Sequence, residues 1–103
     1  MIKAETTEII YEAILNVLNV SEEMLKSASR KANYVDARKI FSYLCREKKI
    51  TYMEIGAMIN REHSTVSFQV EMFPKTIKFD SVLRKKFFDV KLYIDNKIKK
   101  NEQ

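Results

Sequence analysis

The sequence is poor in the residues that form turns and cross-links. It has one glycine, one proline, one cysteine and no tryptophan in 103 residues. An all-β fold needs turn residues every ~8–12 residues, so this fold class is excluded. A lone cysteine cannot form an internal disulfide, which indicates a reducing compartment such as the cytoplasm. No apolar run approaches the ~18–20 residues of a membrane span, and no signal peptide is seen, so no membrane partner is expected.

The composition predicts one helical domain over residues 1–103, with a hydrophobic core and a charged surface. Hydrophobic residues make up 46% and charged residues 32%, and the net charge is +5. Residues 26–49 hold eight basic and two acidic residues, and residues 75–103 hold nine basic and four acidic ones. Residues 1–25 and 50–74 are net acidic. A basic block in a foldable domain is typical of a polyanion-binding protein, although a solvated helix face has the same composition.

Hydrophobic periodicity predicts an all-α bundle of about six helices. The expected helices cover about residues 7–19, 21–28, 34–48, 52–59, 63–72 and 80–99. Pro74 disfavours a helical conformation at Phe73, so we expect the fifth helix to stop near Met72 and residues 74–79 to form a linker. The last helix is rich in lysine toward its end.

Residues 51–70 are predicted to form a short helix, a tight turn and a second helix, the helix-turn-helix arrangement. Thr51 and Glu54 have capping-box spacing, and Asn60 suits a helix end because asparagine tolerates the left-handed conformation. Gly56 costs about 1 kcal/mol relative to alanine in a helix, which predicts close approach by the backbone of the crossing helix. Any helical bundle has such corners, so pattern and charge alone leave DNA binding open.

Three stretches in this region carry a resemblance to a known family. They are Asp36-Ala-Arg-Lys-Ile-Phe-Ser-Tyr-Leu-Cys-Arg-Glu47, Tyr52-Met-Glu-Ile-Gly56 and Arg61-Glu-His-Ser-Thr-Val66. In order and spacing, residues from about 5 to 73 resemble the C-terminal double-stranded DNA-binding domain of the bacterial replication initiator DnaA. The resemblance implies a Trp-repressor-like helix-turn-helix. It also implies binding of double-stranded DNA in replication initiation, in its regulation, or in transcription control.

The resemblance also implies which residues touch DNA. Arg38 matches the family's arginine that reaches the minor groove, and Glu62 is able to accept a hydrogen bond from a cytosine amino group. Free amides at the start of a recognition helix are able to bind a phosphate. We expect base contacts by His63, Ser64, Thr65, Glu62 and Arg38. We expect phosphate contacts by Arg30, Lys31, Lys48, Lys49 and Arg61.

The sequence departs from the family at several positions and lacks other chemistry. Glu62 replaces an aspartate, and Gln69 and Glu71 replace a small and a basic residue, which changes the expected target sequence. No Gly-x-x-x-x-Gly-Lys-Ser/Thr loop is present, so we expect a stand-alone DNA-binding protein without ATPase activity. Cys45 and His63 meet no metal-ligand spacing and no catalytic pattern, so no metal, cofactor or enzymatic activity is expected.

Other readings of the sequence stay open. The basic block would also suit a helical adaptor that docks an acidic protein, and a regulator could mimic an initiator's DNA domain to occupy its sites. The apolar seam of the last helix, at positions 83, 87, 90, 94 and 98, either covers the bundle or pairs with a second copy. The second case would give a homodimer or a protein-partner site.

Overall fold

The computed structural model describes the backbone of residues 3–102 and the side chains of residues 5–99. Every regular element in that range is an α-helix, which confirms the predicted all-α class. In chain order the helices are α1 (Lys3–Leu18), α2 (Glu22–Lys26), α3 (Ala32–Glu47), α4 (Tyr52–Ile59), α5 (His63–Phe79) and α6 (Ser81–Glu102). Within the described range, no helix is both long enough and apolar enough to cross a membrane.

Side chains cap the starts of three helices, among them the cap that the sequence predicts at Thr51. Each capping oxygen accepts a backbone N–H from the first turn, where amides have no partner within their own helix. The donor–acceptor pairs are Met24 N to Ser21 Oγ (3.3 Å), Glu54 N to Thr51 Oγ1 (3.2 Å) and Leu83 N to Asp80 Oδ1 (2.9 Å). These caps fix where α2, α4 and α6 begin.

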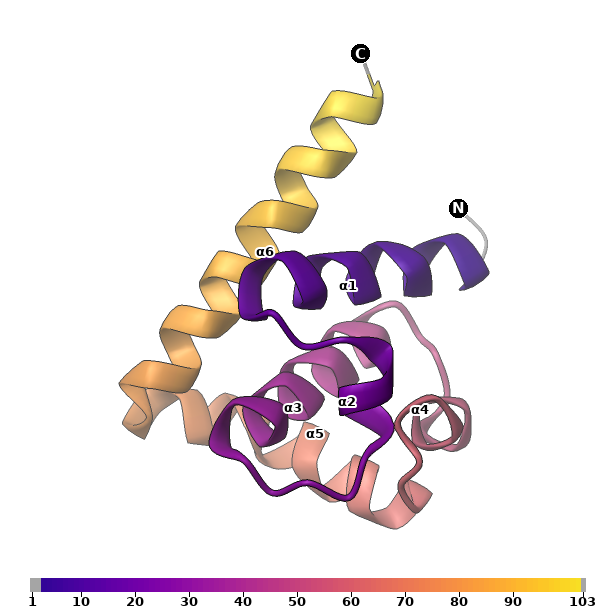
Figure 1. The fold of residues 1–103 in the computed structure, drawn as a ribbon, viewed down its shortest axis with the longest axis vertical. Coiled ribbons are helices and arrows are strands. Elements are labelled where there is room, and N and C mark those ends of the chain that lie inside the picture. The colour runs from indigo at the N-terminus through magenta and orange to yellow at the C-terminus, as the bar shows by residue number, and fades with distance from the viewer. Residues whose placement is uncertain (1–2, 103) are drawn as a thin grey trace.

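The central helix is α3, which packs against α1, α2, α4 and α5. Figure 1 shows α1 above α3, with α5 below it and α4 beside it. The apolar face of α3 is fully or almost fully buried and forms the middle of the core. It consists of Ala37, Ile40, Phe41, Leu44 and Cys45. Burial of a large apolar side chain contributes about 1.5–3 kcal/mol, so this face is the main anchor of the surrounding helices.

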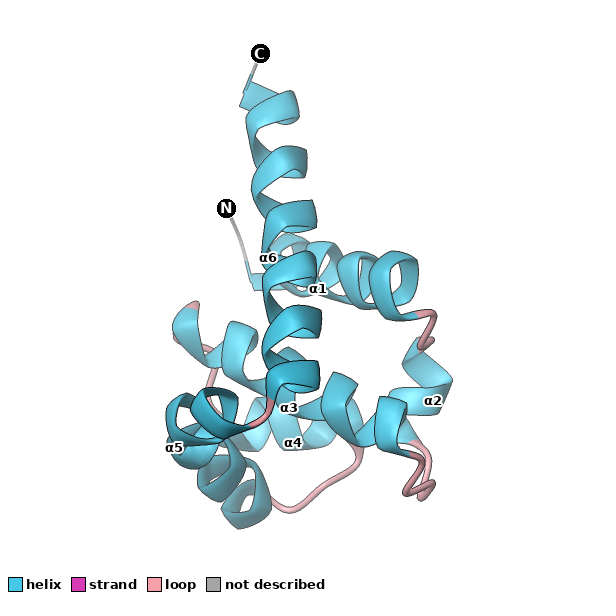
Figure 2. Ribbon diagram, turned by 90° about the vertical axis from the view of Figure 1, so that its left-hand side faces the viewer, coloured by secondary structure: helices cyan, strands magenta, loops and turns pink. Residues whose placement is uncertain are grey.

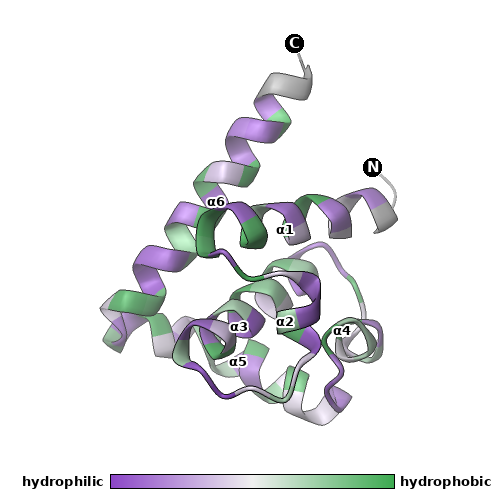
Figure 3. Cartoon of the chain, in the orientation of Figure 1, coloured by the Kyte–Doolittle hydropathy of each residue, from purple (hydrophilic) through white to green (hydrophobic). Residues whose placement is uncertain are grey.

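The long helix α6 packs across α1 and α5 (Figures 1 and 2). Figure 3 shows hydrophobic and hydrophilic residues alternating along it. Its seam residues Leu83 and Val90 are fully buried, and Phe87 joins an aromatic cluster with Tyr43 and Phe73 at ring-centroid distances of 4.6–5.7 Å. The seam therefore covers the bundle. Pairing with a second copy stays a prediction.

One boundary prediction is wrong. α5 does not stop near Met72 but continues through Pro74 to Phe79, so the expected linker at 74–79 is helical. Proline removes one helical hydrogen bond at a cost of about 3 kcal/mol, but apolar side chains that pack against the core on both sides of it offset this cost. Phe73 is buried in the aromatic cluster, and Ile77 packs against the core from the next turn. Tertiary packing therefore overrides the local signal.

Candidate nucleic-acid interface

The corner between α4 and α5 is fixed by backbone contacts. Asn60 ends α4 in the left-handed conformation, with φ 57°, and the N–H of Arg61 donates to the carbonyl of Gly56 at 2.8 Å. A Cβ at Gly56 would collide with the carbonyl oxygen of Arg61. The close approach predicted at Gly56 is therefore real: its tightest contact is with the turn, and the first backbone N of the crossing helix, that of His63, lies 3.6 Å from the same Cβ position. Only glycine leaves the turn its present path.

The start of α5 faces solvent at this corner. His63, Ser64 and Thr65 are all exposed, whereas Val66 is fully buried and holds the helix against the core. The first intrahelical bond runs from the Val66 N–H to the Glu62 carbonyl at 3.1 Å, so the preceding amides have no intrahelical acceptor. Glu62 precedes the helix without capping it through its side chain. Polar side chains and backbone donors thus project together, as they do in recognition helices.

Because α5 is longer than expected, its outer face carries further exposed residues. Phe68, Glu71 and Lys75 follow Ser64 at intervals of three or four residues and are exposed, so they share one face of the helix. The sequence did not indicate that Lys75 lies on this helical face, because Pro74 predicted a linker at residues 74–79. The signal that could have revealed it is the apolar series Val66, Val70, Phe73 and Ile77, which continues past the proline.

The minor-groove contact predicted for Arg38 does not fit the structure. The Arg38 side chain is only 4% exposed, and its guanidinium donates to four backbone carbonyls. The acceptors are the carbonyls of Leu25 (2.7 Å from Nε), Ser29 (2.8 Å from Nη1), and Ser27 and Met24 (2.8 and 3.1 Å from Nη2). Burial, and then the charge of Arg61, lower the pKa of Arg38. Arg38 therefore positions the α2–α3 loop.

Arg61 joins the same loop to the corner. Its Nη2 donates to the carbonyl of Ser27 at 2.8 Å, the atom that Arg38 also binds, and its Nη1 donates to the carbonyl of Asn60 at 3.0 Å. A recess beside α5 is lined by the loop, by Arg30 and Arg61, and by Gln69 of α5. Arg30 and the adjacent Lys31 are exposed on this loop. The structure thus brings Arg30 and Arg61 to the flank of α5.

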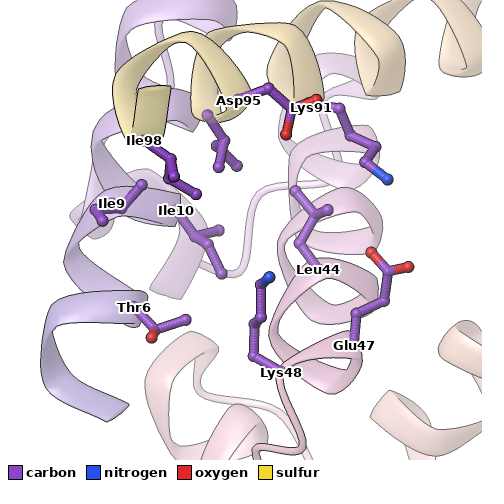
Figure 4. A pocket seen from close by; sticks show the side chains of 10 residues that line it. Thr6, Ile9, Ile10, Leu44, Glu47, Lys48, Lys91, Asp95 and Ile98 are labelled. Atoms are coloured by element: carbon purple, nitrogen blue, oxygen red, sulfur yellow. The ribbon is translucent and has the colours of Figure 1, made fainter. Parts of the chain in front are cut away.

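Lys48 and Lys49 lie elsewhere. Both are in the turn between α3 and α4, whereas His63 follows the opposite end of α4, which is about 12 Å long. Lys48 lines a cleft between α1, α3 and α6, and Figure 4 shows its side chain directed toward Ile10. Their phosphate contacts stay predictions, and the structure does not group them with Arg30.

The lone cysteine belongs to the core. Cys45 is fully buried on α3, and burial raises the pKa of its thiol to about 12. A thiol with this pKa is protonated at neutral pH and is a poor nucleophile or metal ligand. Among the described residues no group of three His, Cys, Asp or Glu side chains could hold a metal ion.

The helix-turn-helix corner lies within a region that matches a known protein family. The family model described as "Bacterial dnaA protein helix-turn-helix" matches residues 7–72. The chain belongs to this family. The DnaA match contains α1 from Thr7 onward, α2 to α4 and α5 up to Met72, including the whole helix-turn-helix corner, whereas α6 lies outside it.

Curated relatives agree with the DnaA family assignment. A chromosomal replication initiator protein DnaA from Pelobacter propionicus is 32% identical over 91 residues, covering 86% of this chain and 20% of that protein. The DnaA protein of Ureaplasma parvum is 36% identical over 72 residues, covering 68% and 16%. That of Nautilia profundicola is 36% identical over 99 residues, covering 94% and 22%. The chain thus spans about a fifth of the length of these relatives. No solved structure gives a significant match.

Proposed function

We propose that this domain binds double-stranded DNA with the start of α5 in the major groove. The observation that carries the proposal is the exposed first turn of α5 on a corner that Gly56 and Asn60 fix by backbone geometry. Recognition helices place N-terminal residues against base edges in this way. The expected base contacts are those of His63, Ser64, Thr65 and Glu62.

Phosphate contacts would come from the flank of the recognition helix. Arg30 and Lys31 are exposed on the α2–α3 loop, and Arg61 lies between that loop and α5. Lys75 is exposed on α5 itself. Lys48 and Lys49 lie farther away and would join only if the duplex also passes the start of α4. Arg38 would act indirectly, because its hydrogen bonds hold the loop in place.

Selection of duplexes from a random pool tests the proposal directly. An enriched motif is the expected result, and a symmetric motif would report a dimer. Affinity for the enriched duplex should fall with salt. Four phosphate contacts predict a slope of log affinity against log salt of about −3.6, and six predict about −5.4. Binding that does not depend on salt would contradict this mode.

Two substitutions separate base contacts from phosphate contacts. Arg30→Ala should weaken binding to all duplexes about equally and make the salt slope shallower by about 0.9, because one phosphate contact is lost. His63→Ala should mainly narrow the difference in affinity between the enriched duplex and random DNA. Lys99→Ala is the matched control, because it removes the same charge from an exposed position near the end of α6, far from α5 (Figure 1). Equal effects of all three substitutions would contradict the proposed orientation.

The competing function is docking of an acidic protein on the same basic surface. The comparison is made at ~150 mM salt, where exposed charges more than ~8 Å apart are largely screened. Under the proposal the enriched duplex should bind there, while polyglutamate should bind weakly and show no dependence on His63. Polyglutamate that displaces the enriched duplex at equal charge concentration would favour the adaptor function.

A further inference from the structure

Phe68 is an exposed aromatic residue on the outermost line of α5. Its side chain is 58% exposed, although its neighbours at two residues on either side, Val66 and Val70, are buried. Successive helix residues are about 100° apart, so a residue two positions from a buried one points to the opposite side of the helix. Within the described residues, none of the aromatic ring pairs includes Phe68. The ring is therefore mostly exposed and belongs to neither the core nor the aromatic cluster.

The same line of the helix carries the residues expected to read DNA. Phe68 is four residues after Ser64 and three after Thr65, so all three side chains lie on neighbouring parts of one face. Ser64 and Thr65 are exposed and polar, and Glu71, three residues further along, is exposed and acidic. Phe68 is the apolar residue of this face, between the polar Ser64 and Thr65 and the acidic Glu71. A duplex that meets Ser64 in the major groove would also meet Phe68.

In the major groove, the apolar feature of a base edge is the C5-methyl group of thymine. We propose that Phe68 is a specificity-determining residue that contacts such a methyl group; the inference rests on the proposed DNA binding. A polar base edge at this point would lose hydrogen bonds to water without gaining a partner, so an apolar edge is favoured. Exposed aromatic surface also gains free energy when a methyl group covers it.

The helix geometry gives the position of the thymine. Phe68 lies four residues after Ser64, which is about 6 Å along the helix axis. Base pairs are about 3.4 Å apart along the duplex axis, so the thymine should be one or two base pairs from the one that Ser64 contacts, depending on how α5 is inclined in the groove. Substitution of Ser64 and of Phe68 should therefore relax the preference at different positions of the same motif.

The test replaces each thymine of the enriched duplex in turn by deoxyuridine, which lacks only the methyl group. For the parent domain, one or two replacements should weaken binding about fourfold each, the value expected for one buried methyl group. Phe68→Ala should weaken binding to the thymine duplex by at least this factor and should be insensitive to the same replacements. Phe68→Leu, which keeps an apolar side chain, should retain part of the sensitivity.

Phe79→Ala is the matched control. It makes the same change on the same helix, 11 residues further along, where the ring is 90% exposed. It should bind like the parent and keep the parent's sensitivity to deoxyuridine. Circular dichroism melting of each variant checks that the fold is retained.

The outcomes separate this inference from the proposed function. Salt-dependent binding of the enriched duplex that no deoxyuridine replacement weakens would overturn the role of Phe68 and leave DNA binding intact. An enriched motif without thymine would have the same effect, as would a Phe68→Ala variant with the parent's deoxyuridine sensitivity. Failure to bind any duplex would overturn both proposals.

Discussion

Removing the donors of Arg38 should destabilise the whole domain, because they connect α3 to the end of α2 and to the loop that follows it. The guanidinium satisfies four backbone carbonyls between residues 24 and 29, and its side chain is almost completely buried. Arg38→Met keeps most of the side chain's volume but leaves the carbonyls of Leu25 and Ser29 without this charged donor. The Ser27 carbonyl keeps its bond from Arg61, and the Met24 carbonyl keeps its bond from the Ser27 hydroxyl. Hydrogen bonds to a charged group contribute about 1.5–3 kcal/mol each, but they are not additive.

Water can reach part of this loop once the guanidinium is gone, so the loss is smaller than the sum of four bonds. We expect Arg38→Met to lower the free energy of unfolding by about 2–4 kcal/mol, because the carbonyls of Leu25 and Ser29 lose this donor at about 1–3 kcal/mol each. Domains of this kind have total stabilities of about 5–15 kcal/mol, so the variant should unfold at a much lower urea concentration. Arg38→Lys keeps the charge and some donors and should lose about half as much.

The measurement is urea unfolding followed by circular dichroism at 222 nm, with Lys39→Met as control. That control makes the same kind of change at the adjacent position, which is partly exposed. Surface substitutions change stability by about 0.5 kcal/mol or less. If Arg38→Met unfolds at the parent's midpoint yet binds DNA poorly, the guanidinium reads the minor groove and the structural role argued here is refuted.

Four further outcomes follow from three single residues. Gly56→Ala should destabilise the domain by about 1–3 kcal/mol in urea unfolding, because its Cβ would meet the carbonyl of Arg61, whereas an ordinary helical glycine is stabilised by this change. Pro74→Ala should raise the free energy of unfolding by about 1–3 kcal/mol, because Pro74 is exposed and the carbonyl of Val70 regains a helical donor. The thiol of Cys45 should stay unreactive toward a disulfide reagent at pH 8 until urea unfolds the domain. Because burial raises the pKa of Cys45 from its ordinary value to about 12, stability should fall as the pH rises above about 8.5 and should continue to fall up to about pH 12.

Most of the fold could be predicted because its local signals agree with its packing. Thr51 and Asn60 bound α4 where capping preferences place them, and the apolar face of α3 is buried as its periodicity predicts. The end of α5 could not be predicted from Pro74 alone. Its continuation depends on Phe73 packing against rings from α3 and α6, which are distant in sequence.

Of the residues around the candidate site, some could also be predicted from the sequence and others could not. The exposed first turn of α5 follows from its polar sequence and from the buried valine behind it, so it was predictable. The burial of Arg38 was not, because its carbonyl acceptors lie 9–14 residues earlier, at the end of α2 and in the following loop, whose path no periodicity describes. A basic residue in a basic segment suggests solvent, and only the folded loop shows that this one faces inward.

Under the proposed function, different elements of this domain determine its affinity for DNA and its selectivity among DNA sequences. The recognition face of α5 carries Glu71 and is preceded by Glu62, so its field opposes the phosphates of any duplex. The attraction comes mainly from the α2–α3 loop, where Arg30 and Lys31 are exposed, with Lys75 adding one positive charge farther along α5. Non-specific binding depends almost entirely on phosphate contacts, so two carboxylates at the groove weaken it for every sequence. Only a duplex whose base edges offset that repulsion binds well, and this requires the loop to be held in register with α5. The Ser27 carbonyl, which accepts from both Arg38 and Arg61, provides that link between the loop and the corner.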